Sequence, residues 1–263
     1  MRHAFLALVL ALSPCIAMAG IDDVEVRETT FTGGDFNDET FRYLFLKPEK
    51  IEPGKSYPLV PFLHGAGERG DDPEVLKKHF LPAMASDEFQ EKFPCFVVAP
   101  QCRTDHWWTA RRRGGTEGSD ELGVMQKMAL QCVDDVVKEF PVDKNRMYLT
   151  GLSMGGYGSW DLATRQPDRW AAVVPICGGG DPSKAAQLVN VPLWAVHGDA
   201  DPAVPVEESR KMIAAIKDAG GSPKYTEYPG VAHDSWTQTY ADPKGVIAWM
   251  FEQRLDERDK AAE

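Results

Sequence analysis

Ser153 stands in the stretch GLSMG (151–155), with a glycine two residues before it and another two residues after it. The preceding RMYLT (146–150) reads as a buried strand, and the following GYGSWDLATRQ (156–166) has apolar residues at helical spacing. A G-x-S-x-G pattern in this context is typical of a tight strand-to-helix turn that holds a strained serine, because side chains at the glycine positions would clash. Such a turn exposes the hydroxyl beside the N-terminus of a helix. The pattern therefore predicts a nucleophile, and the alternative is a glycine-rich loop with an incidental serine.

A serine hydroxyl needs a base, usually a histidine, which a carboxylate orients. Only His197 and His233 follow Ser153 in the chain. His197 comes directly off an apolar run, so we expect it to be a packed, hydrogen-bonded residue at a strand end. His233 lies in a short loop between YPG and a tryptophan, where its ring has room to reach the serine. We therefore predict that His233 is the base.

Two aspartates of the segment HGDADPAVP compete for the role of the acid. Asp201 begins a rigid D-P turn that would hold its carboxylate still, whereas Asp199 lies nearer the strand and is suited to capping that turn. We favour Asp201 and keep Asp199 as the alternative. Asp181 and Asp234 are more typical of caps or solvated loop positions.

The segment HGAGERG (64–70) follows another apolar strand. Attack on an ester creates an oxyanion, which needs two preorganised N–H donors. One donor is the amide of Met154, which follows the serine, and the other belongs to this segment. We choose Ala66, because its small side chain leaves the amide accessible. We expect Glu68 and Arg69 to brace the loop as an ion pair, with a substrate contact of Arg69 as the alternative.

The stretch DHWWTARRRGG follows a predicted strand on the same rim. Trp107 and Trp108 are candidates to line an acyl or aromatic subsite, because indole rings bury a large area with few rotatable bonds. The alternative is that one or both pack in the core. Arg111, Arg112 and Arg113 fit a solvated basic loop better than a site for an anionic substrate.

The elements that must position these residues alternate along the chain. Residues 25–31 and 39–48 predict an N-terminal β-hairpin, joined by the turn-rich TGGDFND. Further strands are predicted at 58–65, 95–100, 146–153, 171–180, 192–198 and 224–229. Helices are predicted at 73–85, 119–140 (capped by Ser119 or Asp120), 156–166, 206–221 and 242–255, followed by a solvated tail at 256–263. This alternation indicates a mostly parallel α/β sheet with helices on both faces, in which sites lie beyond the carboxyl ends of the strands.

Composition narrows the classes of partner. The 263 residues are 43% apolar and carry a net charge of −11, which argues against a nucleic-acid partner. No repeat, low-complexity stretch or linker divides the chain, so we predict a single domain over residues 20–263. The sequence leaves the oligomeric state open.

Residues 1–19 have a basic start, an apolar stretch and AMA before Gly20. These features predict a secretory signal peptide, cleaved after Ala19, and a secreted or periplasmic protein. Lipidation at Cys15 is the alternative, but the proline before it does not suit that signal. The stretch is too short to favour a membrane anchor, and no other segment approaches a transmembrane span.

Four cysteines remain beyond the signal segment: Cys95, Cys102, Cys132 and Cys177. An exported protein has the option of pairing them, and their spacing does not select among the three possible pairings. Buried free thiols are the alternative. No His/Cys cluster of the sequence suggests a metal site.

Taken together, LHGAGERG, YLTGLSMGGYGSW, HGDADPAVP and GVAHDSW resemble the α/β-hydrolase superfamily, over roughly residues 40–251. The resemblance is to its secreted esterase branch: the phospholipase/carboxylesterase, dienelactone hydrolase and polyhydroxybutyrate-depolymerase-like proteins. It implies the α/β-hydrolase fold. It is specific for fold and for the catalytic residues, but not for the substrate.

The same resemblance implies a nucleophile at Ser153, an acid at Asp201, a base at His233, and oxyanion donors at Ala66 and Met154. We therefore expect a serine esterase that forms an acyl-enzyme without metal or organic cofactor. Its substrate would be a small-molecule or polysaccharide-linked ester, with carbohydrate acetyl or feruloyl esters as specific forms. A serine peptidase of the prolyl-oligopeptidase-like type and a non-catalytic binding protein on the same fold are the alternatives.

Overall fold

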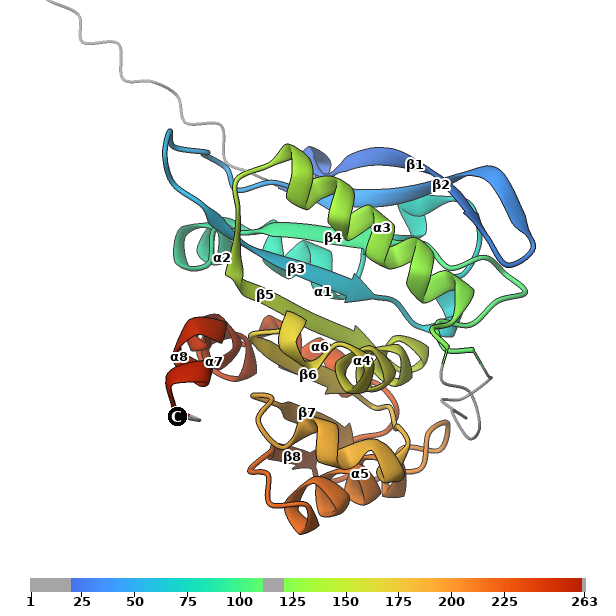
Figure 1. Cartoon of the computed structure of the whole chain (residues 1–263), viewed down its shortest axis with the longest axis vertical. Coiled ribbons are helices and arrows are strands. Elements are labelled where there is room, and N and C mark those ends of the chain that lie inside the picture. Colours follow the sequence, from blue (N-terminus) through green and yellow to red (C-terminus); the bar gives the residue numbers. More distant parts are fainter. Residues whose placement is uncertain (1–19, 111–120, 262–263) are drawn as a thin grey trace, which may run out of the picture.

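The computed structural model describes residues 20–110 and 121–261 and has one eight-stranded sheet. Its strands are β1 Glu25–Gly33, β2 Phe36–Leu46, β3 Tyr57–Leu63, β4 Phe96–Pro100, β5 Val142–Leu152, β6 Ala172–Ile176, β7 Trp194–Gly198 and β8 Lys224–Tyr228. They lie in the order β1-β2-β4-β3-β5-β6-β7-β8 (Figure 1). The pairs β1/β2 and β2/β4 are antiparallel and the others are parallel. The predicted hairpin and mostly parallel sheet are thus confirmed, while the predicted signal segment and Arg111, Arg112 and Arg113 lie outside the described residues.

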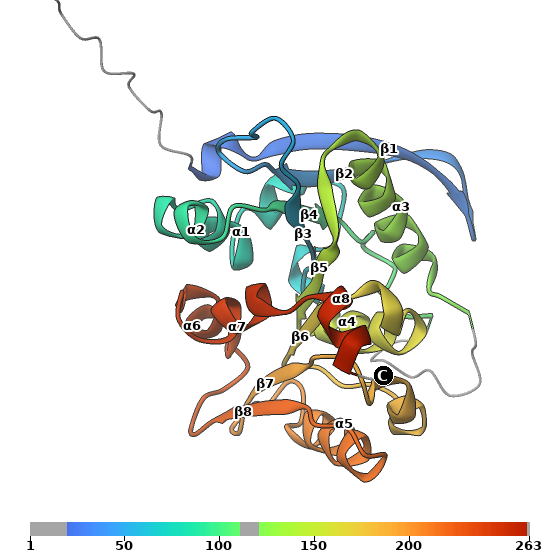
Figure 2. The ribbon, with the colours of Figure 1, turned by 60° about the vertical axis from the view of Figure 1, so that its left-hand side comes forward.

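Helices cover both faces of the sheet, as predicted. They are α1 Phe80–Met84, α2 Asp87–Lys92, α3 Val124–Glu139, α4 Met154–Arg165, α5 Glu207–Asp218, α6 Trp236–Ala241, α7 Val246–Glu252 and α8 Leu255–Ala261. Short 3₁₀ turns lie at η1 Ile21–Asp23, η2 Ala66–Glu68, η3 Pro73–Leu76, η5 Pro167–Arg169 and η6 Pro182–Leu188. Figure 2 shows α3, α4 and α5 on one side and α1, α2, α6 and α7 on the other.

Two hydrophobic cores follow from this layering, one on each face of the sheet. The central strands β3, β4 and β6 are buried at every position, as expected of parallel strands covered on both sides. Apolar burial on both faces is the main stabilising contribution to such a domain. It also holds the carboxyl ends of β3, β5 and β7 along one edge, where the candidate residues lie.

The helices predicted at 73–85 and 119–140 differ from those in the structure. The helix expected at 73–85 is split into η3 and α1, because His79 adopts φ +61° and ψ −103°, outside the helical region. The helix expected from residue 119 begins at Val124, with Gly123 as its N-cap. A Cβ on Gly123 would lie 2.2 Å from the carbonyl oxygen of Trp108, so only glycine fits there. The proposed caps Ser119 and Asp120 lie outside the described residues.

The C-terminal segment also differs from the expectation. The helix predicted at 242–255 begins at Val246 and ends at Glu252, and α6 before it was not predicted. The expected tail forms α8, which is attached to the domain by buried Leu255 and by a hydrogen bond of 2.9 Å from Arg258 Nη1 to the carbonyl oxygen of Pro167. Within the described ranges, no helix combines the length and apolar character that crossing a lipid bilayer requires.

The four cysteines of the described residues are buried free thiols: Cys95, Cys102, Cys132 and Cys177. Cys95 and Cys177 belong to one core, and Cys102 and Cys132 belong to the other. The sheet therefore lies between the two pairs. Of the two options that the sequence left open, the structure has the free thiols.

Candidate active site

Ser153 lies on the tight turn between β5 and α4. Its φ of +53° and ψ of −115° are strained for a residue with a side chain. The turn packs against the end of β3 so closely that a Cβ on Gly155 would lie 1.8 Å from the carbonyl oxygen of Leu63. A Cβ on Gly151 would lie 2.4 Å from the carbonyl oxygen of Gly155. The glycines of the G-x-S-x-G pattern are thus required by contact between backbones.

The structure brings together three of the predicted side chains. Ser153 Oγ lies 3.0 Å from His233 Nε2, and His233 Nδ1 lies 2.7 Å from Asp201 Oδ2. An ionised carboxylate only accepts hydrogen bonds, so Nδ1 carries the proton and Nε2 is free to accept from the serine hydroxyl. This is the geometry in which a histidine removes a proton from serine.

The carboxylate of Asp201 is held on both oxygens. Oδ1 accepts from the amides of Ala203 at 2.8 Å and Val204 at 2.9 Å, within the turn that the D-P sequence predicts. Burial alone would raise the pKa of Asp201, but the hydrogen bonds from His233 and from these two amides outweigh burial and lower it. The carboxylate of Asp201 therefore stays ionised beside His233.

His197 is fully buried, as expected, and it also reaches the acid. Its Nε2 lies 3.0 Å from the carbonyl oxygen of Val204 and 3.3 Å from Asp201 Oδ2, both acceptors, so this nitrogen carries the proton. Its Nδ1 lies 2.8 Å from Ser209 Oγ. Burial lowers the pKa of His197, which keeps the ring neutral. Sequence reasoning missed this contact, although the spacing of four residues in HGDAD hints at it.

The other aspartates have structural roles. Asp199 Oδ1 accepts from the amide of Gly230 at 2.6 Å and so ties the end of β7 to the loop of His233. Asp181 accepts from the amide of Ser183 at the start of η6, and Asp234 accepts from the amide of Thr237 in α6. Asp181 and Asp234 are therefore caps, as the sequence indicated.

The predicted oxyanion loop lies beside the serine. A Cβ on Gly65 would lie 3.7 Å from Ser153 Cβ, which brings the following residue, Ala66, to the nucleophile. Met154 is the first residue of α4, where a backbone N–H has no intrahelical acceptor. The amides chosen from the sequence thus belong to two segments that adjoin Ser153.

His64 anchors this loop and was not singled out from the sequence. Its Nε2 accepts from the amide of Cys102 at 2.9 Å, and its Nδ1 lies 2.6 Å from the carbonyl oxygen of Gly65. Burial lowers the pKa of His64 to about 4, so the ring stays neutral. Its position at the end of β3 is the signal that could have revealed it.

The ion pair expected between Glu68 and Arg69 does not form. Glu68 is buried and instead contacts Lys78 Nζ and His79 Nε2, at 3.6 Å and 3.5 Å. Arg69 Nε donates to the carbonyl oxygen of Ala66 at 3.0 Å, so it still braces the loop. The two side chains diverge because Glu68 finds its partners outside the loop, whereas Arg69 bonds to the backbone of the loop itself.

The two candidate tryptophans separate. Trp108 is fully buried, and its Nε1 donates to the carbonyl oxygen of His64 at 3.0 Å, so it belongs to the core and does not line a subsite. Trp107 is half-buried, and the guanidinium of Arg69 lies 5.1 Å from the centroid of its ring. Only Trp107 keeps the exposure that a substrate contact requires.

One group near the serine has the composition of a metal site. Ligand atoms of Cys177, Asp201 and His233 lie within 4.8 Å of one another. Burial raises the pKa of the Cys177 thiol far above its ordinary value, which disfavours the thiolate that binds metal. A metal bound there would also displace the proton between His233 and Asp201.

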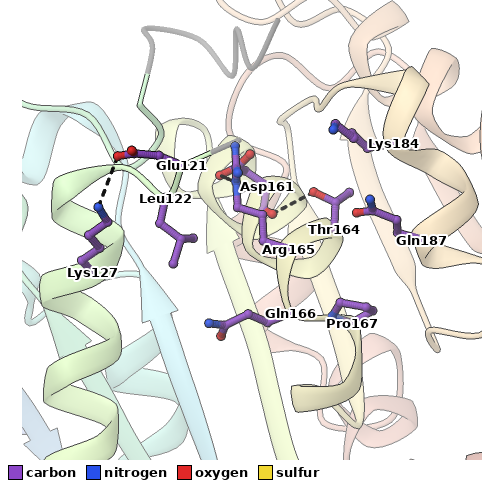
Figure 3. A pocket seen from close by; sticks show the side chains of 10 residues that line it. All are labelled: Glu121, Leu122, Lys127, Asp161, Thr164, Arg165, Gln166, Pro167, Lys184 and Gln187. Atoms are coloured by element: carbon purple, nitrogen blue, oxygen red, sulfur yellow. Dashed lines mark hydrogen bonds and ion pairs between the residues drawn. The ribbon is translucent and has the colours of Figure 1, made fainter. Parts of the chain in front are cut away.

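A cavity of about 570 Å³ lies away from these residues (Figure 3). It is lined by the end of α4, by Lys127 of α3 and by Lys184 and Gln187 of η6. Thr164 on its wall follows Ser153 by eleven positions, which is about 16 Å along a helix. Its lining mixes polar side chains with Leu122 and Pro167, and the Asp161 carboxylate on its wall already accepts from Arg165 Nε at 2.8 Å. The cavity therefore does not contain the serine, acid and base.

Similarity to known proteins agrees with this geometry. The model of the dienelactone hydrolase family matches residues 113–261, more than half of the chain. The chain belongs to the dienelactone hydrolase family. The match includes the segments of Ser153, Asp201 and His233, and the fold of this family member is that of the α/β-hydrolases.

Individual relatives of this family member carry esterase and peptidase names. The chain is 23% identical over 186 residues to a probable feruloyl esterase C of Aspergillus terreus, covering 71% of this chain and 64% of the relative. It is 23% identical to an uncharacterized peptidase of Bacillus subtilis, covering 72% of this chain and 33% of that protein. A crystal structure of a thermostable esterase superposes with a TM-score of 0.81 at 36% identity, covering 89% of this chain and 64% of the other. The chain thus spans less than two thirds of the length of these proteins.

Proposed function

We propose that the protein is a serine esterase that cleaves carboxylic esters through an acyl-enzyme. The observation that carries the proposal is the continuous hydrogen-bonded series from Ser153 Oγ through His233 to Asp201. It begins on a strained serine at the start of a helix. The esterase names of two relatives support the same reaction class.

The chemistry follows from the atoms. Ser153 Oγ attacks the ester carbonyl carbon while His233 Nε2 takes the hydroxyl proton, and Asp201 stabilises the imidazolium that forms. The amides of Ala66 and Met154 donate to the oxyanion. The proton then passes from His233 to the leaving alcohol, and the acyl group stays on the serine. His233 next removes a proton from water, which attacks the acyl-serine; the bond between the acyl carbon and Ser153 Oγ breaks, His233 returns the proton to Oγ, and the acid is released.

A direct test uses short-chain p-nitrophenyl esters together with a fluorophosphonate probe. We expect turnover, covalent labelling at Ser153, and activity that survives a chelator. An absence of both turnover and labelling would favour a non-catalytic binding protein. Activity abolished by chelation and restored by a metal would contradict the mechanism.

Within the esterases, we propose carbohydrate-linked acetyl or feruloyl esters as the substrate class. The feruloyl esterase name of one relative and the half-buried ring of Trp107 beside the oxyanion loop support an aromatic acyl group. A screen that varies acyl and alcohol parts independently tests this. We expect kcat/KM for methyl ferulate to fall in Trp107→Ala more than kcat/KM for methyl acetate, and equal losses would contradict the assignment.

A peptidase is the second candidate, because one relative carries that name. The same series of serine, histidine and aspartate serves acyl transfer from amides. Aminoacyl p-nitroanilides compared with p-nitrophenyl esters distinguish the two. We expect the esters to have the higher kcat/KM, and the reverse order would favour the peptidase.

We further propose that the protein is exported after cleavage behind Ala19. Support comes from the basic, apolar and AMA segments of residues 1–19. Mass spectrometry of the exported protein should find Gly20 at the N-terminus. A lipid on Cys15 would instead establish the alternative.

A further inference from the structure

Trp236, the first residue of α6, packs against the predicted base. Its ring and that of His233 meet edge to face, with centroids 5.2 Å apart and planes at 88°. The indole Nε1–H donates to Nδ1 of His79 at 3.0 Å, across 157 positions of sequence. The ring beside the base is thus fixed by a residue of a distant segment.

The tautomer of the neutral His79 ring follows from this bond. An indole N–H is only a donor, so Nδ1 of His79 is an acceptor, and the neutral ring carries its proton on Nε2. That nitrogen lies 3.5 Å from Glu68 Oε1. The contact with His79 is the largest influence on the pKa of Glu68 and lowers it, so the carboxylate is ionised. Glu68 ends η2, the turn that begins with Ala66.

The backbone of His79 is strained, with φ +61° and ψ −103°. Non-glycine residues persist in such conformations where the surroundings over-determine them, often at functional sites. The next residue, Phe80, is fully buried and packs on Phe62 and Tyr240 at centroid distances of 5.3 Å and 4.9 Å. The side chain of His79 makes no capping hydrogen bond to α1. Its contacts go to Glu68 and Trp236 instead.

We propose that His79 and Trp236 are positioning residues that fix the oxyanion loop and the loop of His233 relative to one another. The series Glu68–His79–Trp236 is called the link below. In the sheet, β5, β6 and β7 separate β3, which leads into the oxyanion loop, from β8, which leads into the loop of His233. The link joins these two loops directly through side chains. The inference rests on the proposed function, because serine, base and oxyanion donors must be aligned together for ester attack.

Two substitutions of His79 distinguish the effect of losing its side-chain contacts from the effect of relieving its backbone strain. His79→Gly removes the link and relieves the strain, since glycine adopts positive φ freely. We expect kcat for a p-nitrophenyl ester to fall on the order of 10-fold, because small misplacements of reacting groups are costly. KM and Tm should not fall. His79→Asn keeps an acceptor near the position of Nδ1 and tolerates positive φ, so it should restore part of kcat.

Trp236→Phe removes the indole N–H together with the pyrrole part of the ring, but keeps an aromatic side chain beside His233. If the link acts as a unit, His79→Gly combined with Trp236→Phe should lower kcat little more than His79→Gly alone. Lys78→Ala is the matched control, because Lys78 also contacts Glu68 but is half-exposed and outside the link. Its effect on kcat should stay below about twofold. Unchanged kcat in His79→Gly, or multiplicative losses in the double variant, would overturn the proposal.

A separate measurement distinguishes failure of the link from failure of the proposed function. The indole N–H of Trp236 should exchange with solvent slowly in the unmodified protein and faster in His79→Gly, as measured by NMR. Equal exchange rates would overturn the link whatever the activity. A protein without turnover or fluorophosphonate labelling would overturn the esterase function, and the link would then be judged on exchange alone.

Discussion

The turn of Ser153 and the loop of His233 are held in place by different forces. At the turn, backbone meets backbone: the space for a Cβ on Gly155 is already taken by the carbonyl oxygen of Leu63, 1.8 Å away. Steric exclusion between backbone atoms therefore fixes the turn that carries Ser153.

The loop of His233 depends on hydrogen bonds and charge. Asp199 accepts from the amide of Gly230 at 2.6 Å, and Asp201 accepts from the imidazole of His233 at 2.7 Å. About a quarter of the His233 side chain (27%) is exposed to solvent. Ser153 is thus held by the close packing of the backbone around its turn, whereas the ring of His233 is oriented by the hydrogen bond from its Nδ1–H to the charged carboxylate of Asp201. The first arrangement tolerates no added atom, and the second is sensitive to the loss of a single charge.

The largest effect should come from the two residues that join these regions. Ser153→Ala or His233→Ala alone should lower kcat by about 10⁴- to 10⁶-fold, and the double variant should be little worse, because the residues act as a unit. Steady-state turnover of a p-nitrophenyl ester measures this. Independent, multiplicative losses would show that the two regions do not cooperate in one step.

The next effect separates the two aspartates of the His233 loop. Asp201→Asn should lower kcat by about 10⁴-fold, because the amide no longer stabilises the imidazolium or its Nδ1–H tautomer. Asp199→Asn keeps an oxygen that accepts from Gly230, so its loss should stay below about 10-fold. The same ester assay ranks both variants. The opposite ranking would move the acid to Asp199.

Adding one methyl group tests the volume-limited turn. Gly155→Ala should lower the free energy of unfolding by about 3 kcal/mol or more, because neither β3 nor α4 can move away cheaply. Gly67→Ala is the control, since a Cβ there would meet nothing within 4 Å. Urea denaturation followed by circular dichroism measures both. A tolerated Gly155→Ala would show that the turn is looser than its packing implies.

The smallest effect concerns the buried His64, whose pKa is lowered to about 4. As the pH falls below about 6.5, His64 becomes protonated in the unfolded chain, whereas in the folded protein it stays neutral down to about pH 4. The free energy of unfolding therefore decreases as the pH falls through this window. The full contribution is about 3 kcal/mol, because burial lowers the pKa of His64 from 6.5 to about 4. His64→Gln should flatten this part of the pH dependence, measured by urea denaturation at several pH values. If the free energy of unfolding changed equally with pH in both proteins, His64 would be protonated in the folded protein as readily as in the unfolded chain.

Much of the fold and of the candidate site could be predicted because short stretches of the sequence determine both. Alternating apolar runs predict the strands, and the rule that sites lie at strand ends selects Ser153, Asp201 and His233 from a long chain. The structure brings these three together. Their catalytic roles remain predictions, which the variants above test.

Other features depend on contacts between distant segments, which local patterns do not contain. The helix expected at 73–85 breaks at His79, which contacts Glu68 and Trp236 on other elements. Trp108 and its neighbour Trp107 look alike in sequence, but only Trp108 is fully buried, beside His64. In each case tertiary packing decides between alternatives that the local sequence leaves equal.

The four buried thiols provide a way to observe each half of the domain separately. Cys95 and Cys177 lie under the helices of one face, and Cys102 and Cys132 lie under those of the other. Burial raises the pKa of Cys102 to about 12 and raises the others further, so none reacts readily while covered. The rate at which an alkylating reagent modifies each thiol therefore reports how often its own layer opens. The chain carries built-in reporters for comparing the local unfolding of its two faces, without any introduced cysteine.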